Sequence, residues 1–221
     1  MKNISSKKFD KDLKLIEHYK KFPSMMPYVG ENYGNLKGKN VLLIAESHYF
    51  PKKSRIHYQA KEWYDSSVND LTEEEVYYIN TRKVLETEWS TVSDVVFREI
   101  NATIQPYVLN QDYRAVTNVA FMNCFQRPGK TGDSIRNSCE KLDIEQSYET
   151  INSVIKVLKP EFVIFYSKFS WDKVGWKLAK NFENINFEFC CHPATGGRYW
   201  HNSNYSNNKQ KIVNYLKEKL G

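Results

Sequence analysis

Four apolar segments, separated along the chain by stretches with helical spacing, are the feature of this sequence that most constrains its fold. The segments span residues 40–45, 115–122, 161–166 and 186–191. An unbroken apolar run is typical of a strand that is covered on both faces, as strands in parallel sheets are. Strands that alternate with helices are joined by right-handed crossovers. The sequence therefore predicts an α/β protein, in which a four-stranded parallel central sheet lies between two layers of helices.

The intervening stretches predict the helices of these two layers. The predicted helices span residues 9–21, 72–87, 91–104, 144–158, 169–181 and 207–220. The second of them begins at Thr72, which has the spacing of a capping box with Glu75. No linker rich in Gly, Ser or Pro divides the 221 residues, and a hydrophobic content of 41% is enough for a sizeable core. We expect one domain over residues 1–221, with a helical insert at about 51–112.

Composition narrows the class of protein and its partners. No apolar run approaches the ~18 residues of a membrane span, and the N-terminus lacks the apolar stretch of a secretory signal, so we expect a cytoplasmic protein without a membrane partner. The four cysteines include no C-x-x-C pair, which indicates neither a zinc site nor an iron–sulfur cluster, and we expect no cofactor. The 32 basic and 26 acidic residues give a net charge of +6, which mildly favours a polyanionic partner such as nucleic acid.

Two of the predicted strands end in polar loops that carry a histidine. Residues 46–49 read Glu-Ser-His-Tyr, and residues 192–198 read His-Pro-Ala-Thr-Gly-Gly-Arg. A third polar loop, at 123–130, follows the second strand. Ligands of open α/β sheets bind outside the carboxyl ends of the strands. We therefore expect Glu46 and His192 to belong to one shared site.

Four short strings, in this order and spacing, resemble the uracil-DNA glycosylase superfamily. They are Ala-Glu-Ser-His-Tyr at 45–49, similar to a GEAPG or GQDPYH loop, Val-Thr-Asn-Val at 116–119 before an Arg-Pro pair, Leu-Lys-Pro-Glu-Phe-Val-Ile at 158–164, and the 192–198 loop, similar to HPSxxxR. The resemblance covers residues 38–200. It implies the α/β/α fold of that superfamily and a DNA repair enzyme, which hydrolyses the N-glycosidic bond of a flipped-out, uracil-like base in DNA.

The resemblance also implies roles for the residues of the first and last loops. Glu46 matches the acidic position and would orient a water molecule or stabilise the cationic sugar. His192 matches the family histidine and would donate to the negative charge that develops on the base. Ser47, His48 and Tyr49 complete the first loop as substrate-binding residues, and the ring of Tyr49 would limit what fits beside a pyrimidine.

Recognition of the base and of the phosphates falls to the other strings. Asn118 matches the family asparagine, whose amide offers a donor and an acceptor to a base edge, and Asn123 at the end of the same strand competes for this role. Arg198, six residues beyond the histidine, would pair with a phosphate. Arg127 and Lys130 would contact nucleic acid beside it.

Departures from the family pattern leave two alternatives open. Ala45 stands where the family loop has glycine, Ser47 and His48 replace its aspartate and proline, and Ala194 replaces the serine of HPS. The iron–sulfur cysteines of the GEAPG group are also missing. One alternative is a superfamily member without repair activity that binds or hydrolyses a nucleoside, a nucleotide or another small ligand. The other is a non-catalytic nucleic-acid-binding module.

Overall fold

A mixed five-stranded sheet forms the centre of the protein in the computed structural model, which describes residues 5–91, 94–108, 114–195, 199–201 and 207–221. The strands are β1 (Tyr28–Val29), β2 (Val41–Phe50), β3 (Ala120–Lys130), β4 (Phe162–Phe165) and β5 (Asn186–Phe189). Their order in the sheet is β1-β3-β2-β4-β5, with β2 to β5 parallel to one another and β1 antiparallel to β3. The predicted α/β class is confirmed.

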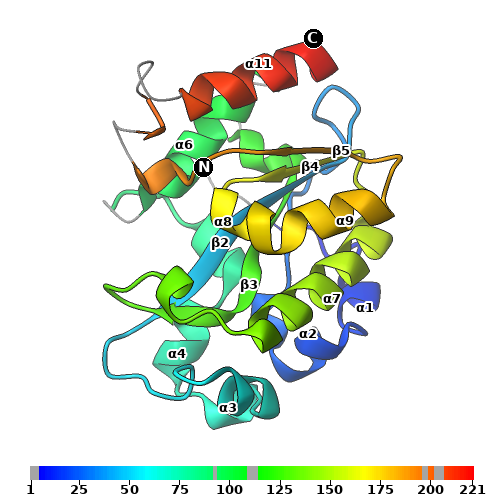
Figure 1. Ribbon diagram of the computed structural model, residues 1–221. Coiled ribbons are helices and arrows are strands. Elements are labelled where there is room, and N and C mark those ends of the chain that lie inside the picture. The colour runs from blue at the N-terminus through cyan, green and yellow to red at the C-terminus, as the bar shows by residue number, and fades with distance from the viewer. Residues whose placement is uncertain (1–4, 92–93, 109–113, 196–198, 202–206) are drawn as a thin grey trace.

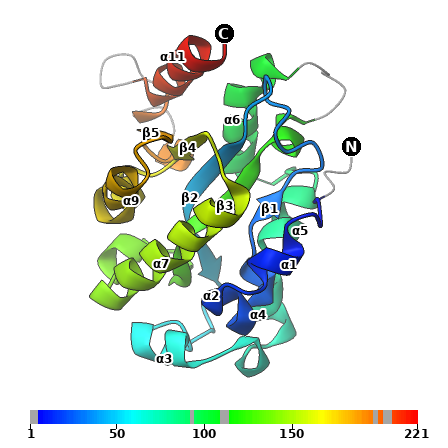
Figure 2. The same cartoon turned by 90° about the vertical axis from the view of Figure 1, so that its right-hand side faces the viewer.

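The prediction of a purely parallel, four-stranded sheet is wrong, because β1 adds an antiparallel edge strand. β1 pairs with β3 through only two residues, Tyr28 with Phe121 and Val29 with Ala120, and it lies beside α5 (Figure 2). A two-residue strand that follows Pro27 has no apolar run of strand length. Its pairing depends on tertiary packing, which a local sequence pattern does not record.

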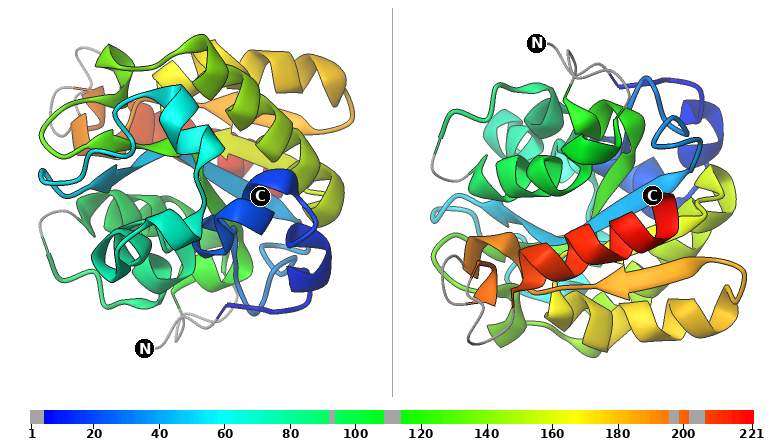
Figure 3. Two further views of the ribbon diagram at one scale, coloured as in Figure 1. Left: turned by 90° about the horizontal axis from the view of Figure 1, so that it is seen from below. Right: turned by 90° about the horizontal axis from the view of Figure 1, so that it is seen from above.

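Helices cover both faces of this sheet (Figures 1 and 3). Their bounds are α1 Asp10–Leu13, α2 Glu17–Lys21, α3 Ala60–Asp65, α4 Glu73–Tyr78, α5 Thr81–Glu86, α6 Val95–Ile104, α7 Lys141–Leu158, α8 Lys168–Ser170, α9 Trp176–Asn181 and α11 Asn208–Leu220. Within β2, Leu42 and Ile44 belong to the core that contains the buried residues of α7, whereas Val41 and Leu43 belong to the core with α6 and α11. The unbroken apolar run therefore reflects two covered faces.

Two of the predicted helices are divided in the structure. The stretch 9–21 contains α1 and α2, and the stretch 72–87 contains α4 and α5. The predicted capping box at Thr72 is present, since its hydroxyl accepts from the backbone N–H of Glu75 and the Glu75 carboxylate accepts from the N–H of Thr72. Asn80 begins a second helix because its side chain accepts from the N–H of Lys83. An asparagine that caps a new helix in this way interrupts the old one.

Strands β2 and β3 continue beyond their apolar runs. Residues 115–118 form a 3-10 turn instead of the predicted start of a strand, and β3 begins at Ala120 and extends to Lys130. The residues predicted as loops pair with each other, Ser47 with Phe125 and Tyr49 with Gly129, with an irregularity between Ser47 and Tyr49. Backbone groups make a parallel ladder whatever the side chains are, so a polar sequence does not end a strand.

Two histidines buried in the core predict acid sensitivity. Burial lowers the pKa of His18 to about 3 and that of His48 to about 4. In the unfolded chain both titrate near 6.5, so the unfolded state takes up protons first and stability falls as the pH drops from about 6.5 to about 4. We expect each histidine to contribute up to ~1.4 kcal/mol per pH unit to this fall. Urea unfolding at several pH values measures it, and His48→Gln should make the fall shallower; an unchanged slope would show that His48 titrates normally.

Candidate active site at the carboxyl edge of the sheet

Glu46 is a buried carboxylate held by groups from both neighbouring strands. Its side chain is only 5% exposed, in the last half of β2. Oε2 accepts hydrogen bonds from Nη2 of Arg136 at 2.9 Å and from Oγ of Ser167 at 2.5 Å. Arg136 belongs to a 3-10 turn that follows β3, and Ser167 follows β4 as the N-cap of α8. The carboxylate is therefore fixed in one orientation at the carboxyl edge of the sheet.

His192 lies beside this carboxylate, in the turn that follows β5. Partial burial lowers the pKa of His192, and the charge of Arg136 lowers it further, while the charge of Glu46 raises it. Nδ1 accepts a hydrogen bond from the backbone N–H of Ala194 at 3.3 Å, so the neutral ring carries its proton on Nε2. Thr195 fixes the turn through two hydrogen bonds to the carbonyl of His192. The structure thus places a neutral imidazole within electrostatic reach of a buried carboxylate.

Ser47 and Tyr49 extend the same edge toward the end of β2. Burial and the charge of Glu46 raise the pKa of Tyr49, whereas the Ser47 hydroxyl lowers it. Tyr49 is 37% exposed. Its ring covers Gly129 on β3, where an added Cβ would lie 2.8 Å from a ring carbon. Glycine at this position gives the tyrosine ring the room to lie against the strand.

The two candidate asparagines lie on either side of the start of β3, which begins at Ala120. Asn123 pairs with Ala45, the residue that precedes Glu46. Asn118 lies in the 3-10 turn before β3, where it is buried and its amide donates to the Ala115 carbonyl and the Thr117 hydroxyl. Asn123 therefore lies level with Ala45, where the apolar run of β2 ends, whereas Asn118 lies before β3 begins.

His48 does not join the other residues of its loop. Its ring is 8% exposed and packs into the core, where Nε2 lies 3.1 Å from the Thr81 hydroxyl at the start of α5. The Thr81 hydroxyl thus gives Nε2 of the buried ring a hydrogen-bond partner. The substrate-binding role that the resemblance implies for His48 therefore does not fit its position.

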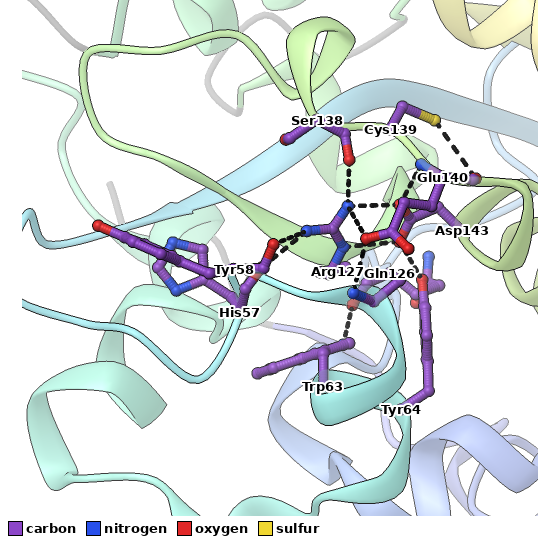
Figure 4. Close-up of polar contacts among 11 residues, drawn as sticks. His57, Tyr58, Trp63, Tyr64, Gln126, Arg127, Ser138, Cys139, Glu140 and Asp143 are labelled. Carbon is purple, nitrogen blue, oxygen red and sulfur yellow. Dashed lines mark hydrogen bonds and ion pairs between the residues drawn. The ribbon is translucent and has the colours of Figure 1, made fainter.

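Arg127 is buried as well, at the centre of the polar network in Figure 4. Nε and Nη2 donate to the two carboxylate oxygens of Asp143 at 2.8 and 2.6 Å. The other N–H groups donate to the backbone carbonyls of His57 and Ser138 at 2.7 and 2.6 Å. The Tyr64 hydroxyl donates to Asp143 too. The network fastens the segment before α3 and the start of α7 to β3, and a phosphate contact from Arg127 does not fit this arrangement.

The remaining predicted phosphate contacts are Lys130 and Arg198. Lys130 ends β3, is exposed, and holds its ammonium 5.1 Å from the centre of the Tyr58 ring. Arg198 lies outside the residues that the structure describes.

Sequence reasoning missed Arg136 and Ser167, the two partners of Glu46. Ser167 follows the third predicted strand directly, so the rule that polar residues at strand ends form the site could have found it. Arg136 has no comparable local pattern. It reaches Glu46 across 90 residues of sequence because the turn after β3 folds back over the sheet edge.

The described residues hold no group of three or more His, Cys, Asp or Glu side chains that could bind a metal ion. Within the same residues, no helix is long and apolar enough to cross a membrane. Comparison with protein-family models gave no match, and a search of curated proteins found none similar in sequence.

Proposed function

We propose that this edge of the sheet hydrolyses an N-glycosidic bond and releases a nucleobase from its sugar. The observation that carries the proposal is that His192, whose Nδ1 accepts from Ala194 and leaves its proton on Nε2, lies close enough to the fixed carboxylate of Glu46 for that charge to raise its pKa. The reaction needs a donor for the negative charge on the departing base and a negative group for the positive charge on the sugar. The two residues supply one of each.

The proposed reaction assigns each charge to one residue. The C1′–N bond breaks and its electron pair moves onto the base, where the Nε2–H of His192 donates to the carbonyl oxygen that gains negative charge. Glu46 stabilises the oxocarbenium-like sugar and positions a water molecule, which attacks C1′ and gives up a proton to the carboxylate. The base anion then takes up, through solvent, the proton that Glu46 received. The carboxylate is restored, and the products are the free base and a sugar with a hydroxyl at C1′.

Asn123 and Tyr49 are the proposed recognition residues. The amide of Asn123 offers a donor and an acceptor to a base edge, and Asn123 pairs with Ala45, the residue before Glu46. The exposed ring of Tyr49 forms a wall beside Glu46. Ser167 and Arg136 act as positioning residues, because they hold the Glu46 carboxylate.

A second candidate is the same reaction on a free nucleoside or nucleotide. The burial of Arg127 favours it, because this side chain was one of three expected to contact phosphates along a strand. A small substrate needs fewer such contacts than DNA does.

The test is an assay of base release by the purified chain. The substrates are single- and double-stranded oligonucleotides that contain uracil, hypoxanthine or xanthine, together with the matching free nucleosides, and the released base is measured by mass spectrometry. We expect release from at least one oligonucleotide. Release from nucleosides alone would favour the second candidate, and no release from any substrate by the folded protein would contradict the proposal.

A further inference from the structure

Two aromatic rings each carry a pair of cations. The guanidinium of Arg55 lies 4.9 Å from the centre of the Tyr58 ring, and the ammonium of Lys130 lies 5.1 Å from it. The guanidinium of Arg136 and the ammonium of Lys173 lie 5.4 and 5.7 Å from the centre of the Phe169 ring. A cation over an aromatic ring is attracted by the ring and loses part of its freedom. Each ring therefore holds its cations in place.

The lysines on the two rings come from segments on opposite sides of β2. Lys130, which reaches Tyr58, is the last residue of β3 and pairs with Phe50. Phe169 belongs to α8, directly after β4. Because β2 lies between β3 and β4, Glu46 of β2 lies between the strand that ends in Lys130 and the strand that leads to Phe169 and Lys173. The exposed ring of Tyr49 packs against Gly129 of β3, the residue before Lys130.

Three of these four cations have no acidic partner within the described part of the chain. No carboxylate there forms an ion pair with Arg55, Lys130 or Lys173. Two lysines close to them in the sequence do have acidic partners, since Lys53 pairs with Glu74 and Lys168 pairs with Asp172. Unpaired cations fixed on rings are suited to bind an anion, because little side-chain freedom remains to be lost.

An acidic group also lies in this region. Asp133 is in the turn after β3, and its Oδ1 accepts from the N–H of Ser134 and from the Asn137 amide. Those bonds orient the carboxylate along its own turn, and none of them involves Arg55, Lys130 or Lys173. The cations on the two rings therefore remain available to an external anion.

We propose that a single strand of nucleic acid crosses this edge, with phosphates on one side of the reacting nucleotide at Arg55 and Lys130 and phosphates on the other side at Lys173. The inference rests on the proposed function and names its substrate class. Anion sites on both sides of the reacting centre fit a polymer, since a free nucleotide has its phosphate on one side only. Cations combined with aromatic rings are typical of channels for single strands, whose bases are already unpaired.

Binding of a labelled oligonucleotide tests this inference without any turnover. Fluorescence anisotropy measures the affinity of a single-stranded, unmodified 15-mer and of the matching duplex over a range of salt concentrations. We expect tighter binding of the single strand. Lys130→Ala and Lys173→Ala should each weaken it roughly tenfold at low salt. Each should also make the slope of log affinity against log salt shallower by ~0.7, the contribution of one phosphate on a single strand.

Lys180→Ala is the matched control. Its ammonium lies 4.7 Å from the centre of the Trp176 ring, so it is also a lysine held on an aromatic ring. It is near the end of α9, which leads back to the start of β5 at the opposite edge of the sheet. Its affinity and salt slope should equal those of the wild type.

Wild-type affinity in both Lys130→Ala and Lys173→Ala would overturn the inference, as would tighter binding of the duplex. Loss in only one variant would also overturn it, since a strand that crosses the site needs both sides. If the proposed function is wrong, the base-release assay gives a different result, which is no release from any substrate. If the wild type releases base but both variants bind the oligonucleotide as the wild type does, the proposed path of the strand is wrong and the proposed reaction still stands.

Discussion

Arg127→Met is expected to lower the free energy of unfolding by about 3–5 kcal/mol, the cost of leaving a buried charge without its partner. Asp143 is fully buried, and both of its carboxylate oxygens accept from the Arg127 guanidinium. The variant also removes the donors to the carbonyls of His57 and Ser138. Urea unfolding at pH 7 measures the loss.

The matched control removes an exposed ion pair. Lys61 pairs with Asp65 on α3, four residues away and with both side chains exposed, so Lys61→Met should leave stability nearly unchanged. A double variant, Arg127→Met with Asp143→Leu, should lose less than Arg127→Met alone, because no buried charge remains. A loss below about 1 kcal/mol for Arg127→Met would contradict the structural role.

His192→Ala is expected to slow base release by roughly a hundredfold or more, which corresponds to about 3 kcal/mol of transition-state stabilisation. The residue lies in a turn at the sheet edge, outside the two apolar cores, so stability should change by less than about 1 kcal/mol. Single-turnover rates and melting temperatures of the variant and the wild type measure the two effects. A large fall in melting temperature with an unchanged rate would show that His192 is structural.

The same assignment predicts the pH dependence of the rate. Burial lowers the pKa of His192 from its ordinary value near 6.5, so the ring is neutral at pH 7 and above. Protonation at lower pH would remove the acceptor at Nδ1 that receives the Ala194 N–H and would place a positive charge beside Arg136. We expect the His192-dependent rate to be constant from pH 8 to 6.5 and to fall in more acidic buffer. A rate that rises as the pH falls through this range would show that the imidazolium is the active form.

The sequence predicted the central strands because their burial on both faces leaves a continuous apolar run. Residues 161–166 and 186–191 correspond closely to β4 and β5. The polar ends of β2 and β3 were predicted as loops, since side-chain polarity does not report backbone pairing between residues 47 and 125. The same limitation placed Asn118 in a strand, although it lies in a turn before one.

The candidate site was predictable where its residues follow strands. Glu46 and Asn123 follow the apolar runs within β2 and β3, and His192 follows β5. The parallel order of these strands brings all three beyond the same end of the apolar runs. Arg127 and His48 lie in equally polar segments, but both side chains are buried. Arg127 binds Asp143, and His48 contacts Thr81. Such long-range pairing leaves no local trace, so sequence reasoning assigned both residues to the surface of the site.

Single-turnover base release by the wild type and by the double variant Glu46→Gln with His192→Ala, on the best oligonucleotide substrate, shows whether these two residues carry the reaction. Melting temperatures show that both proteins are folded. The account predicts release by the wild type and none above the uncatalysed background by the double variant. Equal release by the two folded proteins would contradict the assignment of these residues, and an inactive, folded wild type would contradict the proposed reaction itself.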